Sequence, residues 1–118
     1  MGSSGKRTAR LDLMQGTLDM LILRTLQQES RHGQEIIRRI RMGSGGSIVV
    51  NHGSLYPALQ RLLRRGLVRA SWGTSANNRR ARYYALTASG KKELEAESDR
   101  WNRFSAAIAG VMRMEQES

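Results

Sequence analysis

Two segments of the chain, residues 51–65 and 77–82, concentrate side chains that donate hydrogen bonds to anions and to base edges. In the first segment, Gln60 can pair with an adenine edge, and Arg61 or Arg64 can reach a guanine edge or a phosphate. Because these donors recur at helical spacing, the first segment indicates a helix that enters a DNA major groove.

The second segment holds three arginines and two asparagines within six residues. Strand alternation places Arg80 and Arg82 on one face and Arg79 at the tip of a turn that contains Asn77 and Asn78. Such a turn suits the DNA backbone or a narrow minor groove, and a solvated basic hairpin is the alternative interpretation. Of these arginines, Arg82 is the one that we expect to form an internal salt bridge.

Residues 51–65 have the pattern of an amphipathic helix. Apolar residues fall at i, i+3, i+4, i+7 and i+8, namely Leu55, Ala58, Leu59, Leu62 and Leu63. Asn51 or Ser54 can cap the helix start, and Gly66 can end it in the left-handed conformation. Pro57 is expected in the first turn, where its missing N–H has little effect. The residues on or beside the other face are Ser54, Pro57, Gln60, Arg61 and Arg64.

Other residues of this helix have two interpretations each. The Tyr56 hydroxyl can donate to a phosphate, or its ring can pack on the hairpin. Ser54 and the backbone N–H groups at the helix start suit phosphate oxygens. Arg65 is expected to pair with Glu35 or to face solvent.

The rest of the chain predicts further helices, a turn and strands. Helices are expected over 15 or 17–28, 33–42 and about 87–114, a turn over 30–33, and strands over 48–50, 68–72 and 79–86. The strand over 68–72 alternates as a half-buried strand should, with Trp72 inside. The fold class is therefore mainly α with a small β-hairpin, a winged helix-turn-helix domain plus a C-terminal dimerisation helix. We expect a disordered or tag-like arm over 1–10, the DNA-binding domain over 11–87 and the dimerisation helix over 88–118.

The C-terminal helix carries a heptad seam. Leu94, Trp101 and Ile108 are seven residues apart. The adjoining row has the same spacing and consists of Glu97, Phe104 and Val111. The seam can pack on the first helix of its own subunit, or it can be shared with a second copy, which we favour. The expected dimer interface is Leu18, Ile22, Leu94, Trp101, Phe104, Ile108 and Val111. Trp101 and Phe104 are also candidate ligand-binding residues, because paired aromatic rings near a dyad can form an apolar slot; a filled interface without a cavity is the alternative.

Charge and composition narrow the function classes. The chain has 118 residues and a formal net charge of +10, and its excess of basic residues lies before residue 91. A basic body suits nucleic acid or an anionic membrane surface. We expect no membrane segment, because no apolar run approaches the ~18–20 residues that span a bilayer. With no signal peptide and no cysteine, a cytoplasmic protein is expected.

Catalysis and metal binding find little support in the residue types. The chain has no cysteine and two histidines, His32 and His52, and no carboxylates at ligand-like spacing from them. His32 is interpreted as a cap or turn residue. The glycine-rich loop 43–46 lacks the Gly-Lys-Ser/Thr of a phosphate loop. We therefore expect no enzyme, no cofactor and no metal.

Several runs of residues together resemble the PadR-like family of winged helix-turn-helix transcriptional regulators, in its short form with a single C-terminal helix. The matching runs are Leu18–Leu26, His32–Ile36, Gly53–Leu59, Arg61–Leu62, Arg65–Leu67, Arg80–Tyr84 and Leu86–Gly90. The resemblance covers about residues 11–110. The sequence departs from the family at Gln34, where tyrosine is more usual, and in the glycine-rich loop 43–47.

The resemblance implies a homodimer that binds a palindromic operator, usually as a repressor, and in many relatives releases DNA when a small molecule binds. It also implies a backbone contact for Tyr56 and a planar or hydrophobic effector near Trp101. The residues expected at the DNA are Asn51, Ser54, Tyr56, Pro57, Gln60, Arg61, Arg64, Asn78, Arg79, Arg80 and Arg82. The alternative function is a basic module that binds RNA or an anionic membrane without regulating genes.

Overall fold

The computed structural model describes residues 15–115 as four helices and three strands. In chain order these are α2 (Gln15–Thr25), β1 (Arg31–His32), α3 (Gly33–Gly43), α4 (His52–Arg64), β2 (Val68–Thr74), β3 (Arg80–Leu86) and α5 (Ala88–Met112). The mainly helical fold with a small sheet confirms the expected fold class. The arm expected over 1–10 lies outside the described residues.

The core lies where the apolar stripes of α2, α3 and α4 meet, and the base of the sheet closes it. Its largest fully buried side chains are Ile22, Leu23, Ile36, Leu55, Leu59 and Leu62. These positions follow the three- and four-residue spacing of a helix that is buried on one face. Val68 and Tyr84 bring the sheet into the same cluster, and Leu94 adds the first part of α5.

The sheet has three antiparallel strands in the order β1-β3-β2, so the expectation of a plain hairpin and of a turn over 30–33 was incomplete. Arg31 pairs with Tyr84, and His32 pairs with Tyr83. The strand of two residues was missed because it is too short to show alternation. The expected strand over 48–50 was wrong, since this segment is a loop in which only Val50 is buried.

The first helix ends earlier than expected, at Thr25 instead of residue 28. The Thr25 hydroxyl donates to the Ile22 carbonyl at 2.8 Å, and Arg31 Nε donates to the Thr25 carbonyl at 2.7 Å. These bonds satisfy acceptors at the helix end, so the chain can turn there toward β1. The second helix matches its expected bounds, and His32 caps it by accepting from the Glu35 N–H.

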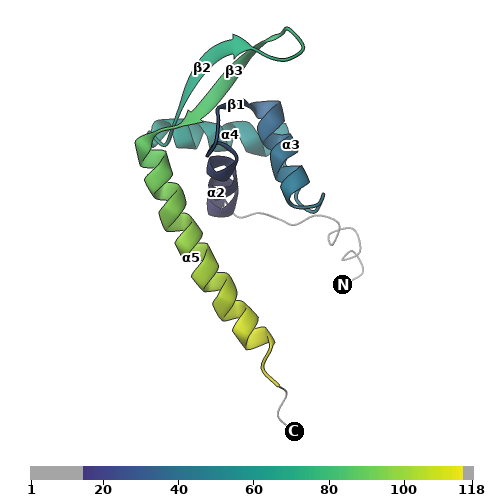
Figure 1. The fold of residues 1–118 in the computed structure, drawn as a ribbon, viewed down its shortest axis with the longest axis vertical. Coiled ribbons are helices and arrows are strands. Elements are labelled where there is room, and N and C mark those ends of the chain that lie inside the picture. Colours follow the sequence, from purple (N-terminus) through teal and green to yellow (C-terminus); the bar gives the residue numbers. More distant parts are fainter. Residues whose placement is uncertain (1–14, 116–118) are drawn as a thin grey trace.

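The long helix α5 leaves the body of the molecule on the side opposite the hairpin β2–β3 (Figure 1). Thr87 caps α5, because its hydroxyl accepts from the Gly90 N–H at 3.0 Å and donates to the Gly66 carbonyl at 2.7 Å. The helix start is thus tied to the turn that follows α4. Within residues 15–115, no helix combines the length and the apolar character needed to cross a membrane.

Candidate nucleic-acid interface

The helix α4 begins at a well-formed cap. Of the two candidates, Asn51 is the capping residue, and its side chain accepts from the Ser54 N–H at 2.9 Å. Because the helix therefore starts at His52, Pro57 lies in the second turn and not, as expected, in the first. Pro57 has no N–H to donate to the carbonyl of Gly53, four residues earlier. Gly53 is exposed, so water can bond to that carbonyl instead.

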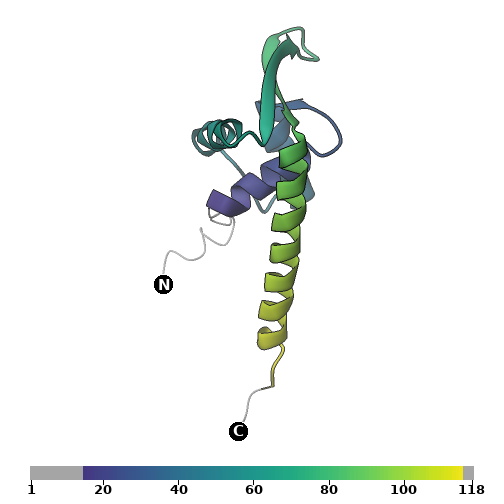
Figure 2. The same cartoon turned by 90° about the vertical axis from the view of Figure 1, so that its left-hand side faces the viewer.

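One stripe of α4 is free of the core along its whole length. The exposed residues at i, i+4, i+7 and i+11 are Gly53, Pro57, Gln60 and Arg64. Among residues 15–115, Arg64 forms no ion pair. Figure 2 shows α4 nearly end-on at one side of the molecule, with the hairpin above it. The stripe therefore presents donors from a convex helix that a duplex groove can accept.

Arg61 lies at the edge of this stripe but is held by the core. Its Nη2 donates to Asp19 Oδ1 of α2 at 2.9 Å, and its side chain is 24% exposed. Its Nε is buried and has no hydrogen-bond partner. In this conformation Arg61 joins α2 to α4 instead of pointing outward, so the expectation that it stands free on the DNA-facing side is corrected.

Arg65 forms an ion pair, but with a different partner from the one expected. Its Nη2 lies 3.3 Å from Glu93 Oε2 of α5. The expected partner, Glu35, instead lies 3.1 Å from the buried Arg31. Arg65 therefore links α4 to α5, and it faces away from the stripe that carries Gln60.

Tyr56 of α4 contacts His52 in its own helix and lies beside the first residue of α3. Its ring stacks on His52 with the centroids 5.8 Å apart, and the side chain is still partly open to solvent. A Cβ added to Gly33 would lie 2.5 Å from the Tyr56 hydroxyl, so the first residue of α3 has to be glycine for this approach. The hydroxyl thus lies beside the start of α3, whose free N–H groups favour anions.

The hairpin β2–β3 forms the wing, and its arginines lie on rings instead of carboxylates. The Arg80 guanidinium is 4.6 Å from the Trp72 ring centroid, and that of Arg82 is 5.8 Å from the Tyr84 centroid. The internal salt bridge expected for Arg82 is absent among the described residues. Trp72 was expected inside but is 61% exposed, because the wing extends past the helices that would cover it.

The wing ends in a turn held by its own side chains. Ser75 accepts from the Arg79 N–H, and Asn78 adopts a positive φ of 63°. Asparagine tolerates this conformation better than most residues do. The turn leaves Asn78, Arg79 and Arg80 exposed.

Tyr84 fixes the base of the wing against α4. Burial raises the pKa of its phenol above the usual value; the Arg82 guanidinium acts in the opposite direction, and Tyr56 adds to the rise. Tyr84 is buried in the core cluster that also holds Leu55 and Leu59 of α4. The base of the wing and α4 therefore share one core, and the exposed wing arginines lie beyond it.

The seam of α5 divides into a buried and an exposed part. Leu94 is buried in the core, and so are Leu18 and Ile22 of α2, so these three residues are removed from the expected dimer interface. The remaining four are exposed over their large apolar side chains: Trp101, Phe104, Ile108 and Val111. Within residues 15–115, this row stays largely open to solvent, on a helix that leaves the body.

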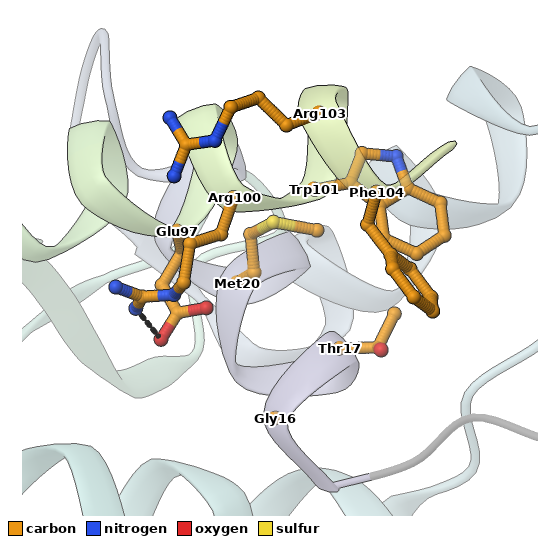
Figure 3. Close-up of a pocket in the computed structure, with 8 residues that line it drawn as sticks. All are labelled: Gly16, Thr17, Met20, Glu97, Arg100, Trp101, Arg103 and Phe104. Atoms are coloured by element: carbon orange, nitrogen blue, oxygen red, sulfur yellow. Dashed lines mark ion pairs between the residues drawn. The ribbon is translucent and has the colours of Figure 1, made fainter. Parts of the chain in front are cut away.

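An open groove of about 590 Å³ lies between α2 and this part of α5. Figure 3 shows Trp101 and Phe104 close together near Thr17, with Met20 on the floor between the helices. The opposite side holds an ion pair in which Arg100 Nη2 lies 2.7 Å from Glu97 Oε2. The groove thus joins an aromatic wall to a charged rim.

The sequence matches the model of the transcriptional regulator PadR-like family over residues 22–96. Because this match covers more than half of the chain, the protein belongs to that family, whose members are DNA-binding transcriptional regulators rather than enzymes. The matched residues include α4 and the wing described above.

Known relatives agree with this assignment. An uncharacterized protein X of Lysinibacillus sphaericus is 30% identical over 92 residues, which are 78% of this chain and 84% of the relative. A PadR-like transcriptional regulator from Bacillus cereus is 26% identical with a TM-score of 0.74, over 85% of this chain and 95% of that one. A transcriptional regulator from Clostridium thermocellum is 27% identical with a TM-score of 0.72, over 80% and 92%.

Sequence reasoning missed two residues that shape this interface. Asp19 shows no ligand-like spacing and is 42 residues from Arg61, so nothing local indicated their ion pair. Trp72 was interpreted as half-buried from alternation alone. The hairpin register could have suggested that Trp72 and Arg82 share a face of the sheet. It could not have shown that this part of the face extends past the core.

Proposed function

We propose that this PadR-family protein is a repressor that binds a palindromic operator in the cytoplasm as a homodimer. The observation that supports this most directly is the exposed stripe of α4 that ends in Gln60 and Arg64, beside a wing whose arginines have no carboxylate partners among the described residues. A stripe of donors suits base edges, and a basic wing suits phosphates.

In this proposal α4 enters the major groove and the wing follows the flanking backbone. Gln60 and Arg64 read base edges, while Tyr56, Asn51 and Ser54 lie near the phosphates at the helix start. Pro57 packs against the groove wall. Asn78, Arg79, Arg80 and Arg82 contact the backbone or the adjacent minor groove. Arg61 enters this set only if its ion pair with Asp19 opens.

The homodimer is supported by the exposed apolar row of α5. Trp101, Phe104, Ile108 and Val111 recur at the three- and four-residue spacing of a coiled-coil seam. A second α5 that packs on this row would remove a large apolar surface from water, and it would place two α4 helices in one assembly. Residues 11–87 are then the DNA-binding part and 88–118 the dimerisation part.

Selection of binding sites from random duplexes with the purified protein tests the proposal. We expect an inverted repeat whose half-site centres lie about one helical turn, ~34–36 Å, or a multiple of it apart. Competition with RNA and with anionic vesicles is the control. Selection of single unrepeated sites contradicts the palindrome, and preferential binding to RNA or vesicles supports the basic-module alternative instead.

A small-molecule effector is a second element of the proposal, supported by the groove between α2 and α5. Its aromatic wall suits a planar ligand, either hydrophobic or with a cation that lies over a ring. Titration of a planar cationic dye into a Trp72→Phe variant, which keeps Trp101 as its single tryptophan, tests this. Quenching that saturates supports an effector site; unchanged emission at high dye concentration contradicts it.

A further inference from the structure

Trp72 is a large apolar side chain on the wing that the fold does not bury. It is 61% exposed, more than Trp101, and it lies in the middle of β2. Tryptophan is enriched at interfaces, because its ring combines a large apolar area with an N–H donor. The surroundings of Trp72 in the wing indicate what its partner would be.

The face that carries Trp72 is the face that the sheet turns toward the helices. Across β2 and β3, Val68 pairs with Leu86, Ala70 with Tyr84, and Trp72 with Arg82, so these side chains share one face. At the base of the wing this face is buried in the core through Val68 and Tyr84. Trp72 lies farther out on the same face, where the core has ended.

This outer part of the face begins where the core that it shares with α4 ends. Tyr84 is buried in the core cluster that also holds Leu55 of α4, and the Arg82 guanidinium lies over the Tyr84 ring. Arg80 then lies over the Trp72 ring at 4.6 Å. Guanidiniums and rings therefore alternate outward along this face, from the core shared with α4 to the exposed end of the wing. In the proposed complex, this end follows the backbone beside the groove that α4 enters.

We propose that Trp72 is itself a DNA-contact residue. One part of its ring holds the Arg80 guanidinium in place, and the remaining exposed part packs on a deoxyribose of the backbone beside the half-site. A guanidinium already ordered on an aromatic ring loses less conformational freedom when it meets a phosphate. The indole N–H is a donor that can also reach a phosphate oxygen.

This inference rests on the proposed operator binding, and affinity measurements with the selected operator test it. We expect Trp72→Ala to raise the Kd about 5- to 10-fold, and Trp72→Phe, which keeps an aromatic face, to raise it less. Met42→Ala, which truncates another exposed apolar side chain on α3, is the matched control and should leave the Kd unchanged. The double variant Trp72→Ala/Arg80→Ala should lose less binding free energy than the two single variants lose together, since each substitution removes the same contact.

Tryptophan fluorescence gives a second readout that does not depend on how the alanine variant folds. Operator duplex should protect the wild-type protein from acrylamide quenching more than it protects Trp72→Phe, and the difference reports Trp72. Equal protection of the two proteins overturns the inference, and so does a Trp72→Ala affinity equal to that of Met42→Ala in a folded variant. A wild-type protein that binds no duplex overturns the proposed function instead, so the two failures are distinguishable.

Discussion

Neighbouring donors on α4 have different surroundings, and in the proposed complex this difference favours one of them over the other for reading a base. Gln60 is exposed, whereas the Arg61 guanidinium is already bonded to Asp19. Base recognition needs a donor that is free before the duplex arrives, since a bonded donor must first give up its partner. Sequence spacing alone gave both residues the same role.

Replacing Gln60 tests the base-reading role. Gln60→Ala is expected to relax base preference by about 1–3 kcal/mol at one position of each half-site, because the amide that pairs with a base edge is lost. Affinity against every single-base variant of the selected operator measures this. Equal losses at all positions and on random duplex would show that Gln60 contacts only the backbone.

Replacing Asp19 tests the structural role of Arg61. Asp19→Ala leaves the Arg61 guanidinium partly buried without its acceptor and should lower the free energy of unfolding by about 1–3 kcal/mol, less than for a fully buried pair because Arg61 retains some solvent contact. Urea denaturation measures the change. Glu29→Ala, which removes an exposed carboxylate from Arg31, is the control and should lower it by at most ~1 kcal/mol. Equal urea midpoints for the two variants would contradict this role.

At the scale of elements, the proposed complex assigns charge to the wing and specificity to α4. Arg79→Ala is expected to weaken binding to all duplexes alike and to lower the slope of log K against log salt by about one, since one phosphate contact is lost. Arg69→Ala removes an equal charge from the face of β2 that does not carry Trp72, and it should leave the slope unchanged. Identical slopes for both variants would show that only net charge matters.

The junction between the wing and α5 depends on a residue without a side chain. A Cβ at Gly90 would overlap the Leu67 carbonyl oxygen and approach Leu86 Cδ2 at 2.9 Å. Gly90→Ala is therefore expected to lower the free energy of unfolding by about 1–3 kcal/mol. In the same helix, Gly110 has no atom within 4 Å of its added Cβ, so Gly110→Ala should stabilise by up to ~1 kcal/mol. Thermal unfolding compares the two, and a Gly90→Ala protein as stable as Gly110→Ala would contradict the tight junction.

The elements that the sequence predicted well are those with strong local signals. The stripe Leu55–Leu62 and the Asn51 cap located α4 to within a residue, and the seven-residue repeat located α5. What could not be predicted depends on distant contacts. Two examples are the pairing of Arg31 with Tyr84, which creates β1, and the bond from Arg31 to Thr25, which ends α2. For the same reason Leu18, Ile22 and Leu94 were placed at a dimer interface, because periodicity does not distinguish burial in one subunit from burial between two.

For the whole molecule, the proposed homodimer depends on the exposed row of α5. Ile108→Lys is expected to weaken self-association by about 100-fold or more, because a charge would be buried in an apolar seam. Ala106→Lys adds the same charge on the opposite side of the helix and should leave assembly intact. Sedimentation at several concentrations measures both. A monomeric wild-type protein, or equal behaviour of the two variants, would contradict the proposed seam.

Thr87 donates from its hydroxyl to the Gly66 carbonyl and from its N–H to the Leu67 carbonyl, and these two bonds to the turn after α4 have a mechanical consequence for such a pair. The 25 residues of α5 are about 37 Å long. In the proposed dimer, the first residues of α5 are bonded to the turn after α4, and the last ones meet the second copy. A tilt of α5 by about 5° about its far end would move its first residues by about 3 Å, close to the rise of one base pair. An effector bound beside Trp101 would then change the distance between the two reading helices and leave the helices themselves unchanged.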